Sequence, residues 1–385
     1  MHLRAVALLL VSIWQCYAVL PDIGAPGYTC DAELMKPSKK IPTNVNSVRP
    51  ADIKVVMALG DSLTAANGAG AEDPVAVFLQ YRGLAFQAGG DASLDTHITI
   101  PNILKKYNSK LFGYSVGIGS PNVWEISYLN VAMPGAIAAD LPGQARTLVS
   151  LLHSHPESVD YEKDWKLLNI FIGGNDMCSF CKDGKLAPTE CVQHIYEAIE
   201  IIYGNVPRVI VSVTAMLQLE ILRQSDKGRL FCQELHTQEC PCESDSKDFN
   251  NTYLANTCID YANQEMDLAA SGRFDKHDFA VVTQPFFRDI AEPPMKDGLV
   301  NKEFFAPDCF HFSQWGHALV STWLWKNILE PVGAKTTQGS ASVPSLPLAC
   351  PDPKCPFIRT NANSKDCSKY ITPVADTVYE TNSIE

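Results

Sequence analysis

The chain has 385 residues, of which 46% are hydrophobic, 19% charged and 9% aromatic, and this composition is typical of a globular protein and not of a disordered, collagen-like or coiled-coil chain. Lysine and arginine together number 31 against 43 aspartates and glutamates, which gives a net charge of −12. This acidic balance argues against a nucleic-acid partner and against electrostatic docking on anionic lipid, because both need clustered basic residues.

The first 18 residues have the pattern of a secretory signal. An apolar run over residues 5–14 follows Arg4, and Cys16 and Ala18 supply small residues just before a cleavage point. A membrane anchor is the alternative, but the run is shorter than the ~20 residues that a span needs. We therefore expect an exported, extracellular protein, with the lysosome as the alternative destination and no later membrane span.

Short apolar segments alternate with helical segments through the middle of the chain. The expected strands cover residues 53–59, 128–132, 167–172, 208–214 and 279–283. The expected helices cover residues 141–152, 189–203, 257–270 and 313–329. The later strands lack the alternation of a half-exposed strand, which is typical of a buried parallel sheet. This order predicts the α/β class, with a mainly parallel five-stranded sheet wound on both faces by helices.

The chain divides into four parts on composition. The signal at 1–18 is followed by an N-terminal extension at 19–50, one α/β domain at 51–335 and a cysteine-containing C-terminal extension at 336–385. Both extensions are rich in Pro, Ser, Thr, Lys and Asn and have no periodicity. No internal repeat is visible.

Twelve cysteines follow the predicted signal, and an even number in an exported chain indicates disulfides. A metal or redox site at Cys178 and Cys181 is the alternative, but a zinc site needs a second paired set of ligands, and the spacing of Cys240 and Cys242 does not supply it. We therefore expect structural bridges, no metal and no cofactor. Asn250 is the acceptor of the one clear glycosylation sequon.

Polar residues follow the expected strands, at the edge where open α/β sheets bind ligands. Ser62 follows the first strand, Gly135 the second and Asn175 the third, while Asp308 and His311 stand just before the last helix. Residues three apart on a turn face the same way, so Asp308 can hold one ring nitrogen of His311 while the other takes a serine proton. The backbone N–H groups of Ser62 and Gly135 and the side-chain amide of Asn175 are candidate oxyanion donors. The pattern predicts acyl-ester chemistry with Ser62 as nucleophile.

Ser115 stands in a Gly-x-Ser-x-Gly pattern that is typical of the nucleophile in another class of hydrolase. That class needs a buried strand before the serine and a helix after it, whereas residues 105–110 are polar and residues 117–121 cannot start a helix. Ser115 is therefore disfavoured.

Three further polar residues have structural interpretations. We expect Asp61 and Asp176 to cap loops, and His317 to be an exposed helix residue and not a metal ligand.

Four blocks of the sequence resemble the signature blocks of the GDSL, or SGNH, hydrolase family. They are Gly60-Asp61-Ser62-Leu63, Gly135, Gly173-x-Asn175-Asp176 and Asp308-x-x-His311. From about residue 53 to residue 333 the chain resembles the phospholipase B branch of animals, in the stretches 58–70, 81–84, 171–176, 284–287 and 305–313. Mammalian members of that branch carry several repeats and a membrane anchor, whereas we identify one repeat and no anchor.

The resemblance implies a flavodoxin-like three-layer α/β/α fold and metal-free cleavage of acyl esters in phospholipids and lysophospholipids. It also implies that Ser62 is the nucleophile, that Gly135 and Asn175 are oxyanion donors, and that Asp308 and His311 complete the triad.

We therefore expect a secreted phospholipase B that contacts lipid surfaces transiently and has no stable protein partner. An esterase for acylated sugars or short acyl esters is one alternative, and a non-catalytic lipid-binding protein on the same fold is another. A group of aromatic rings either lines an acyl groove or belongs to the ordinary core, and the core is favoured: Phe78, Tyr81, Phe86, Phe286 and Phe287.

Overall fold

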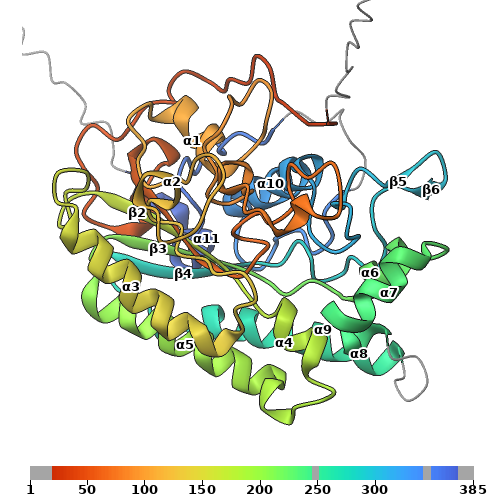
Figure 1. Ribbon diagram of the computed structural model, residues 1–385. Helices are drawn as coiled ribbons and strands as arrows, with labels where there is room; N and C mark the ends of the chain where they lie inside the picture. Colours follow the sequence, from red (N-terminus) through yellow and green to blue (C-terminus); the bar gives the residue numbers. More distant parts are fainter. Residues whose placement is uncertain (1–19, 245–250, 341–347, 372–385) are drawn as a thin grey trace, which may run out of the picture.

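A computed structural model describes residues 20–244, 251–340 and 348–371 (Figure 1). The predicted signal and the Asn250 sequon acceptor lie outside the described residues. The central sheet has four parallel strands in the order β1-β2-β3-β4. Their bounds are β1 (Ile53–Gly60), β2 (Trp165–Phe171), β3 (Val209–Thr214) and β4 (Phe279–Gln284).

Helices cover both faces of this sheet, as Figure 1 shows, with α3, α5 and α9 on one face and α1 and α10 on the other. The longer helices are α1 (Ile100–Tyr107), α3 (Leu141–Ser154), α5 (Pro188–Asn205), α7 (Leu230–Glu239), α9 (Asn251–Ala270) and α10 (Gln314–Leu329). The shorter ones are α2 (Trp124–Ser127), α4 (Gly174–Ser179), α6 (Glu220–Ser225), α8 (Pro241–Ser244) and α11 (Asn361–Lys365). The predicted α/β class and the three-layer arrangement are therefore confirmed.

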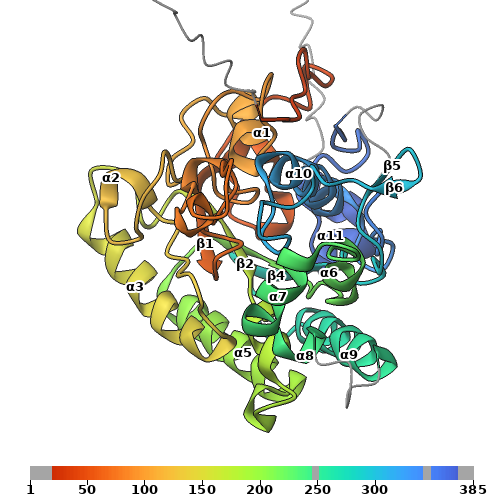
Figure 2. The same cartoon turned by 45° about the vertical axis from the view of Figure 1, so that its right-hand side comes forward.

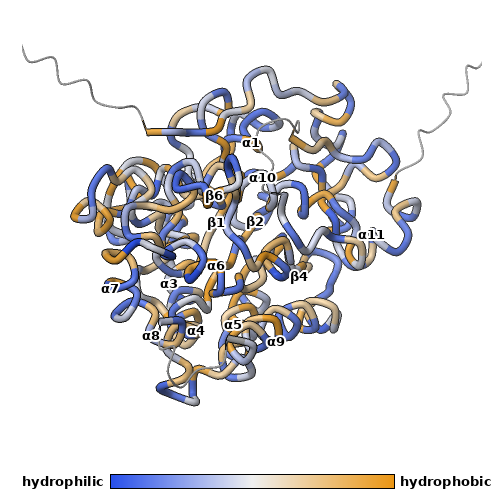
Figure 3. Tube along the Cα trace, turned by 90° about the vertical axis from the view of Figure 1, so that its right-hand side faces the viewer, coloured by the Kyte–Doolittle hydropathy of each residue, from blue (hydrophilic) through white to orange (hydrophobic). Residues whose placement is uncertain are grey.

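The strands lie in the core because helices shield both of their faces. All seven residues of β2 and all six of both β3 and β4 are buried, as expected for apolar strands of a parallel sheet. Along α5 and α9 the hydropathy alternates in Figure 3, because one side of each helix packs inward while the other faces solvent.

The sheet differs from the prediction in its number of strands. The expected strand at residues 128–132 keeps its place beside β1, where the N–H of Val131 donates to the carbonyl of Ala58 at 2.9 Å, but Ala58 and Asn130 form only an isolated parallel bridge. Tyr128 has a φ of +43°, which breaks the extended backbone at the start of this segment. The segment therefore lies where the fifth strand was predicted, beside β1, but it does not form a strand.

The cysteine prediction is correct for ten of the twelve cysteines. The bonds join Cys30 to Cys350, Cys178 to Cys240, Cys181 to Cys242, Cys232 to Cys309 and Cys355 to Cys367. Cys191 and Cys258 are buried thiols, which corrects the expectation that all twelve are bridged. They lie in the interiors of α5 and α9, where Cys191 Sγ donates to Asp176 Oδ1 at 3.2 Å, so each behaves as a small core residue.

The small helices α6, α7 and α8 gather beside α9 (Figure 2), and α6 follows closely after β3. This group lies at the carboxyl ends of the strands, where the expected site residues stand. A two-stranded hairpin, β5 (Met295–Lys296) and β6 (Leu299–Val300), follows β4. Among the described residues, no helix is both long enough and apolar enough to cross a membrane.

Candidate active site

The loop that carries Ser62 is anchored at the end of β1 by Gly60. The N–H and the carbonyl of Gly60 are both bound by the side-chain amide of Gln144 from α3, each at 2.9 Å. A Cβ at Gly60 would lie 2.4 Å from the carbonyl oxygen of Phe171 on β2, and its φ is +156°. Only glycine allows this close approach of β1 and β2. Glycine at position 60 therefore fixes where the Ser62 loop begins.

Ser62, His311 and Asp308 form a continuous hydrogen-bonded chain. Ser62 Oγ lies 2.8 Å from His311 Nε2, and His311 Nδ1 lies 2.5 Å from Asp308 Oδ2. With Nδ1–H donating to the carboxylate, Nε2 remains an acceptor for the serine hydroxyl proton. The structure thus brings together three residues that are up to 249 positions apart in sequence, in the geometry of an activated nucleophile.

Asp308 and His311 lie in a tight turn before α10. Asp308 Oδ1 accepts the backbone N–H groups of Phe310 at 3.1 Å and His311 at 3.0 Å, and the N–H of Ala306 donates to the carbonyl of His311. Cys309, between them, has a φ of +63° and is bonded to Cys232 at the start of α7. The turn is therefore held from within by Asp308 and from outside by α7.

Asp308 and His311 each stabilise the charged form of the other. Burial disfavours the Asp308 carboxylate, but the neighbouring His311 and the hydrogen bonds that Asp308 accepts outweigh it and hold the pKa of Asp308 below its ordinary value. Burial also disfavours a charged His311, yet the charge and hydrogen bond of Asp308 outweigh it and raise the pKa of His311. The imidazole is therefore a stronger base than a free histidine.

Three candidate donors follow the ends of strands or of the segment beside β1. In the described part of the chain, the backbone N–H groups of Ser62 and Gly135 donate to no protein acceptor, and Gly135 has a φ of +77°. The side-chain amide of Asn175, in the first turn of α4, donates to the carbonyl of Ala136 at 2.8 Å, which leaves its second N–H for a ligand. These are the three donors that the sequence indicated for an oxyanion.

Arg82 is a residue that the sequence reasoning missed. It is fully buried and donates to the carbonyls of Asn130 at 3.0 Å and Ala132 at 2.7 Å, which lead into Gly135. Burial lowers the pKa of Arg82 to about 10, so it stays charged at neutral pH. Its position in the 81–84 stretch of the family resemblance was the one available signal.

A second missed residue, His236 on α7, lies behind the triad. Its Nδ1 is 3.2 Å from Asp226 Oδ2, and its Nε2 is 3.2 Å from the carbonyl oxygen of Asp308. Burial alone would lower the pKa of His236, but Asp226 outweighs it and raises that pKa. The imidazole therefore links α7 to the turn that carries Asp308.

Glu243 lies beside this pair and accepts a hydrogen bond from Arg223 Nε at 2.9 Å. Ligand atoms of Asp226, His236 and Glu243 lie within 4.8 Å of one another. Each carboxylate of this cluster therefore has a protein partner, Arg223 for Glu243 and the His236 ring for Asp226.

The structure also shows the surroundings of three other residues that the sequence analysis considered. Ser115 is buried and donates to the carbonyl of Arg82 at 2.8 Å, away from the triad hydrogen bonds. Asp61 accepts the N–H of Leu63 at 2.9 Å, and Asp176 accepts that of Ala138 at 3.0 Å, as expected for loop caps.

The prediction for His317 was wrong. It is fully buried on α10, and its Nδ1 accepts the N–H of Phe86 at 3.2 Å. Most residues of α10 are buried, and at this position the rings of Phe86 and Phe312 pack on His317, so the helix has no exposed face there.

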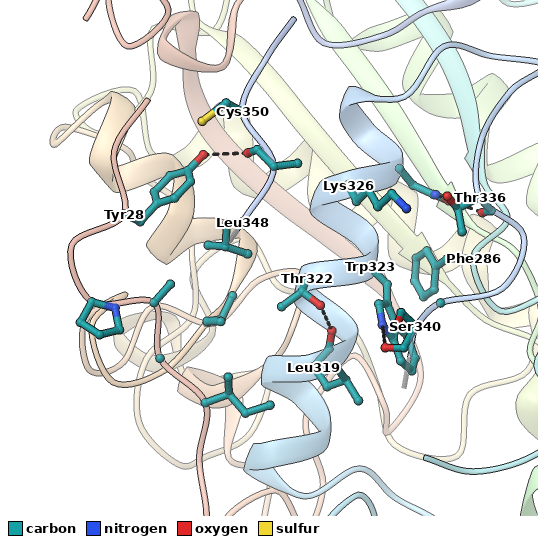
Figure 4. A pocket seen from close by; sticks show the side chains of 18 of the residues that line it. Tyr28, Phe286, Leu319, Thr322, Trp323, Lys326, Thr336, Ser340, Leu348 and Cys350 are labelled. Atoms are coloured by element: carbon teal, nitrogen blue, oxygen red, sulfur yellow. Dashed lines mark hydrogen bonds between the residues drawn. The ribbon is translucent and has the colours of Figure 1, made fainter. Parts of the chain in front are cut away.

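The aromatic residues considered for an acyl groove separate into two groups. Phe86, Phe286 and Phe287 are buried in the core, whereas Tyr81 is partly buried and Phe78 is 80% exposed. A cavity of about 810 Å³ lies between α10 and the two extensions, with Phe286 and Trp323 in its wall (Figure 4). No triad residue lines this cavity, so it is separate from the candidate active site.

The chain is similar to known proteins over most of its length. Residues 56–324 match the family described as GDSL-like Lipase/Acylhydrolase. The chain is 39% identical over 347 residues to "Phospholipase B1, membrane-associated" of Mus musculus, covering 88% of this chain and 23% of that protein. It is 41% identical over 341 residues to the protein of the same name in Homo sapiens, covering 85% and 23%. The chain thus spans about a quarter of the length of these relatives.

Proposed function

Because the chain belongs to the GDSL-like lipase/acylhydrolase family, we propose that it is a phospholipase B, a serine esterase that removes the acyl groups of glycerophospholipids and lysophospholipids. The observation that carries the proposal is the chain of hydrogen bonds from Asp308 through His311 to Ser62. The lipid substrate rests on the relatives, whose printed name is phospholipase B1. Five disulfides favour an exported protein.

In this proposal Ser62 Oγ attacks the ester carbonyl carbon while His311 Nε2 takes the hydroxyl proton. The carbonyl oxygen becomes an oxyanion that accepts from the N–H groups of Ser62 and Gly135 and from the amide of Asn175. The imidazolium, stabilised by Asp308, then gives its proton to the glycerol oxygen as the ester C–O bond breaks. Water attacks the acyl-Ser62 ester by the same route and releases the fatty acid.

The two alternatives make different demands on the site. An esterase for acylated sugars or short acyl esters would use the same three residues, so only the substrate separates it from a phospholipase. A lipid carrier has no need of an Asp308–His311 pair aligned on a serine, and the retention of that pair favours an enzyme.

The first prediction concerns substrate and nucleophile together. We expect fatty-acid release from a dialkanoyl phosphatidylcholine and from the matching lysophosphatidylcholine, with Ser62→Ala lowering turnover by about 10³-fold or more. Across p-nitrophenyl esters kcat/KM should rise with chain length, because each buried methylene contributes about 0.8 kcal/mol. Ser115→Ala is the matched control and should keep nearly full activity.

Two outcomes would contradict the proposal. A preference for acetylated xylose and two-carbon esters without lipid turnover would move the assignment to the sugar-esterase alternative. Loss of activity in Ser115→Ala with activity kept in Ser62→Ala would overturn the nucleophile.

A further inference from the structure

The most exposed large apolar side chains are concentrated in three segments. Leu230 is 82% exposed, Phe78 80%, Val75 79% and Leu299 73%, and every other large apolar side chain in the described part of the chain is less exposed. Single exposed apolar residues are ordinary, but a group of them near one site marks an interaction surface. Each of the three segments is connected to the triad turn.

The first segment carries Val75 and Phe78 and packs beside the triad turn. Val77, between them, lies in one small apolar cluster with Ala306, two residues before Asp308. The carbonyl of Ala69 accepts the N–H of Gln314, the first residue of α10. This segment therefore borders the turn on the side of the Ser62 loop.

The second segment is the start of α7, where Leu230 is followed by Phe231, which is 54% exposed. The next residue, Cys232, is bonded to Cys309 inside the turn between Asp308 and His311. The exposed end of α7 is therefore one residue away from a covalent link to the triad.

The third segment is the β5–β6 hairpin, which carries Leu299. The N–H of Asn301 donates to the carbonyl of Pro294 across its base, and the N–H of Phe304 donates to Asn301, which leads directly into the triad turn. Figure 1 shows this hairpin and α7 on the same flank of the molecule.

We propose that Val75, Phe78, Leu230 and Leu299, here called the apolar rim, insert into a zwitterionic lipid surface and bring the candidate active site onto it. The proposal rests on the proposed function. Three segments that are distant in sequence are each connected to the turn that carries Asp308 and His311. A lipid surface in contact with them would also supply the substrate of the proposed reaction.

Charge favours a neutral lipid surface. Glu72 and Asp73 lie just before Val75, Lys227 and Arg229 lie just before Leu230, and Lys296 and Asp297 lie just before Leu299, so the formal charges beside the rim cancel. The whole chain carries a net charge of −12, which disfavours an anionic surface, whereas a phosphatidylcholine surface has no net charge. The apolar rim therefore fits a neutral bilayer or micelle.

The test compares two double variants in a Ser62→Ala background, by co-sedimentation with phosphatidylcholine vesicles. Phe78→Ser with Leu230→Ser should weaken binding about 100-fold, because two large apolar side chains lose their burial. Ile41→Ser with Ile371→Ser is the control and should bind as the parent does. Ile41 is 57% exposed and precedes Pro42, whose carbonyl accepts Trp165 Nε1 at the start of β2, the opposite end of the sheet.

Turnover on vesicles, compared with turnover of a soluble ester, distinguishes a role in docking from a role in the active site. With Ser62 intact, the Phe78→Ser/Leu230→Ser variant should lose at least tenfold in turnover on vesicles and keep p-nitrophenyl butyrate hydrolysis within twofold. An equal loss on both substrates, or unchanged vesicle binding, would overturn the proposal. So would tighter binding to vesicles with added phosphatidylserine, or sedimentation showing a parent dimer that the variant converts to monomer.

The docking proposal and the proposed phospholipase function can fail independently of each other. Vesicle binding that depends on the apolar rim, in a protein that hydrolyses soluble esters but no phospholipid, would support docking and reject the phospholipase assignment.

Discussion

The His311 imidazole can act as a base only when it is neutral, so its pKa sets the lower pH limit of the proposed reaction. Burial opposes its charge, but Asp308 outweighs burial and raises the pKa of His311 above 6.5. We expect kcat/KM to rise with pH through a midpoint above 6.5, since protonated His311 cannot accept the Ser62 proton. A pH series on a soluble ester measures this midpoint.

Asp308→Asn is the matching variant. It should lower kcat by about 10⁴-fold and move the remaining midpoint downward, because the charge that favours the imidazolium is gone. An unchanged midpoint would assign the pH limit to another group.

Asn175 gives a second test on a single residue. Asn175→Ala should lower kcat by about 10²- to 10³-fold with little change in KM, because an oxyanion donor acts on the transition state. The thermal midpoint should be followed as well, since the amide also donates to Ala136 in the free protein. A change confined to KM would make Asn175 a binding residue.

Single residues also show where the sequence is informative. Ser62 and Asn175 are predictable as candidates because each follows an apolar strand, and strand ends meet at one edge of a sheet. Arg82 and His236 are not predictable in this way, because their partners are backbone carbonyls of segments far away in sequence. His317 was misplaced because the residue that packs on it, Phe86, is also far away in sequence.

Among the elements, α7 is linked to the triad turn without being next to it in sequence. It joins the triad turn through the Cys232–Cys309 bond and through the contact between His236 and the Asp308 carbonyl. The turn contains a strained Cys309, so its position depends on these external contacts.

This link predicts an unequal effect of two disulfides. Replacing both Cys232 and Cys309 by alanine should lower kcat about 10- to 100-fold in the molecules that remain folded, because the triad is displaced. Replacing Cys355 and Cys367, whose bond spans 12 residues in the C-terminal extension, should leave kcat unchanged and lower stability by about 3 kcal/mol. Equal kcat values for the two variants would show that α7 does not position the turn.

The expected strands agree with β1, β2, β3 and β4 because an apolar run of that length has one stable place in a parallel sheet. The segment at residues 128–132 has the same composition but lies on the edge next to β1, where few ladder bonds hold it and the positive φ of Tyr128 interrupts it. The apolar composition predicts where this segment lies in the sheet. Whether it forms a strand depends on how many hydrogen bonds it makes with β1.

For the whole molecule, the contacts around Asp226, His236 and Glu243 predict independence from metals. EDTA should change neither the turnover nor the thermal midpoint, because each carboxylate in this cluster already has a side-chain partner from the protein. Turnover and melting measured with and without EDTA provide the check. A loss that zinc or calcium restores would place a metal in this cluster.

The Cys30–Cys350 bond, which closes 320 residues of sequence, makes nearly the whole described chain a covalent ring. Mechanical force applied to the two termini would therefore pass through one sulfur–sulfur bond and bypass the sheet. A molecule stretched between its ends in an optical trap would extend only by the residues outside this ring and outside the Cys355–Cys367 loop, until a reductant opened the bonds and transferred the load to β1 and its neighbours. The same ring would keep a chain cut once between Cys30 and Cys350 in one piece.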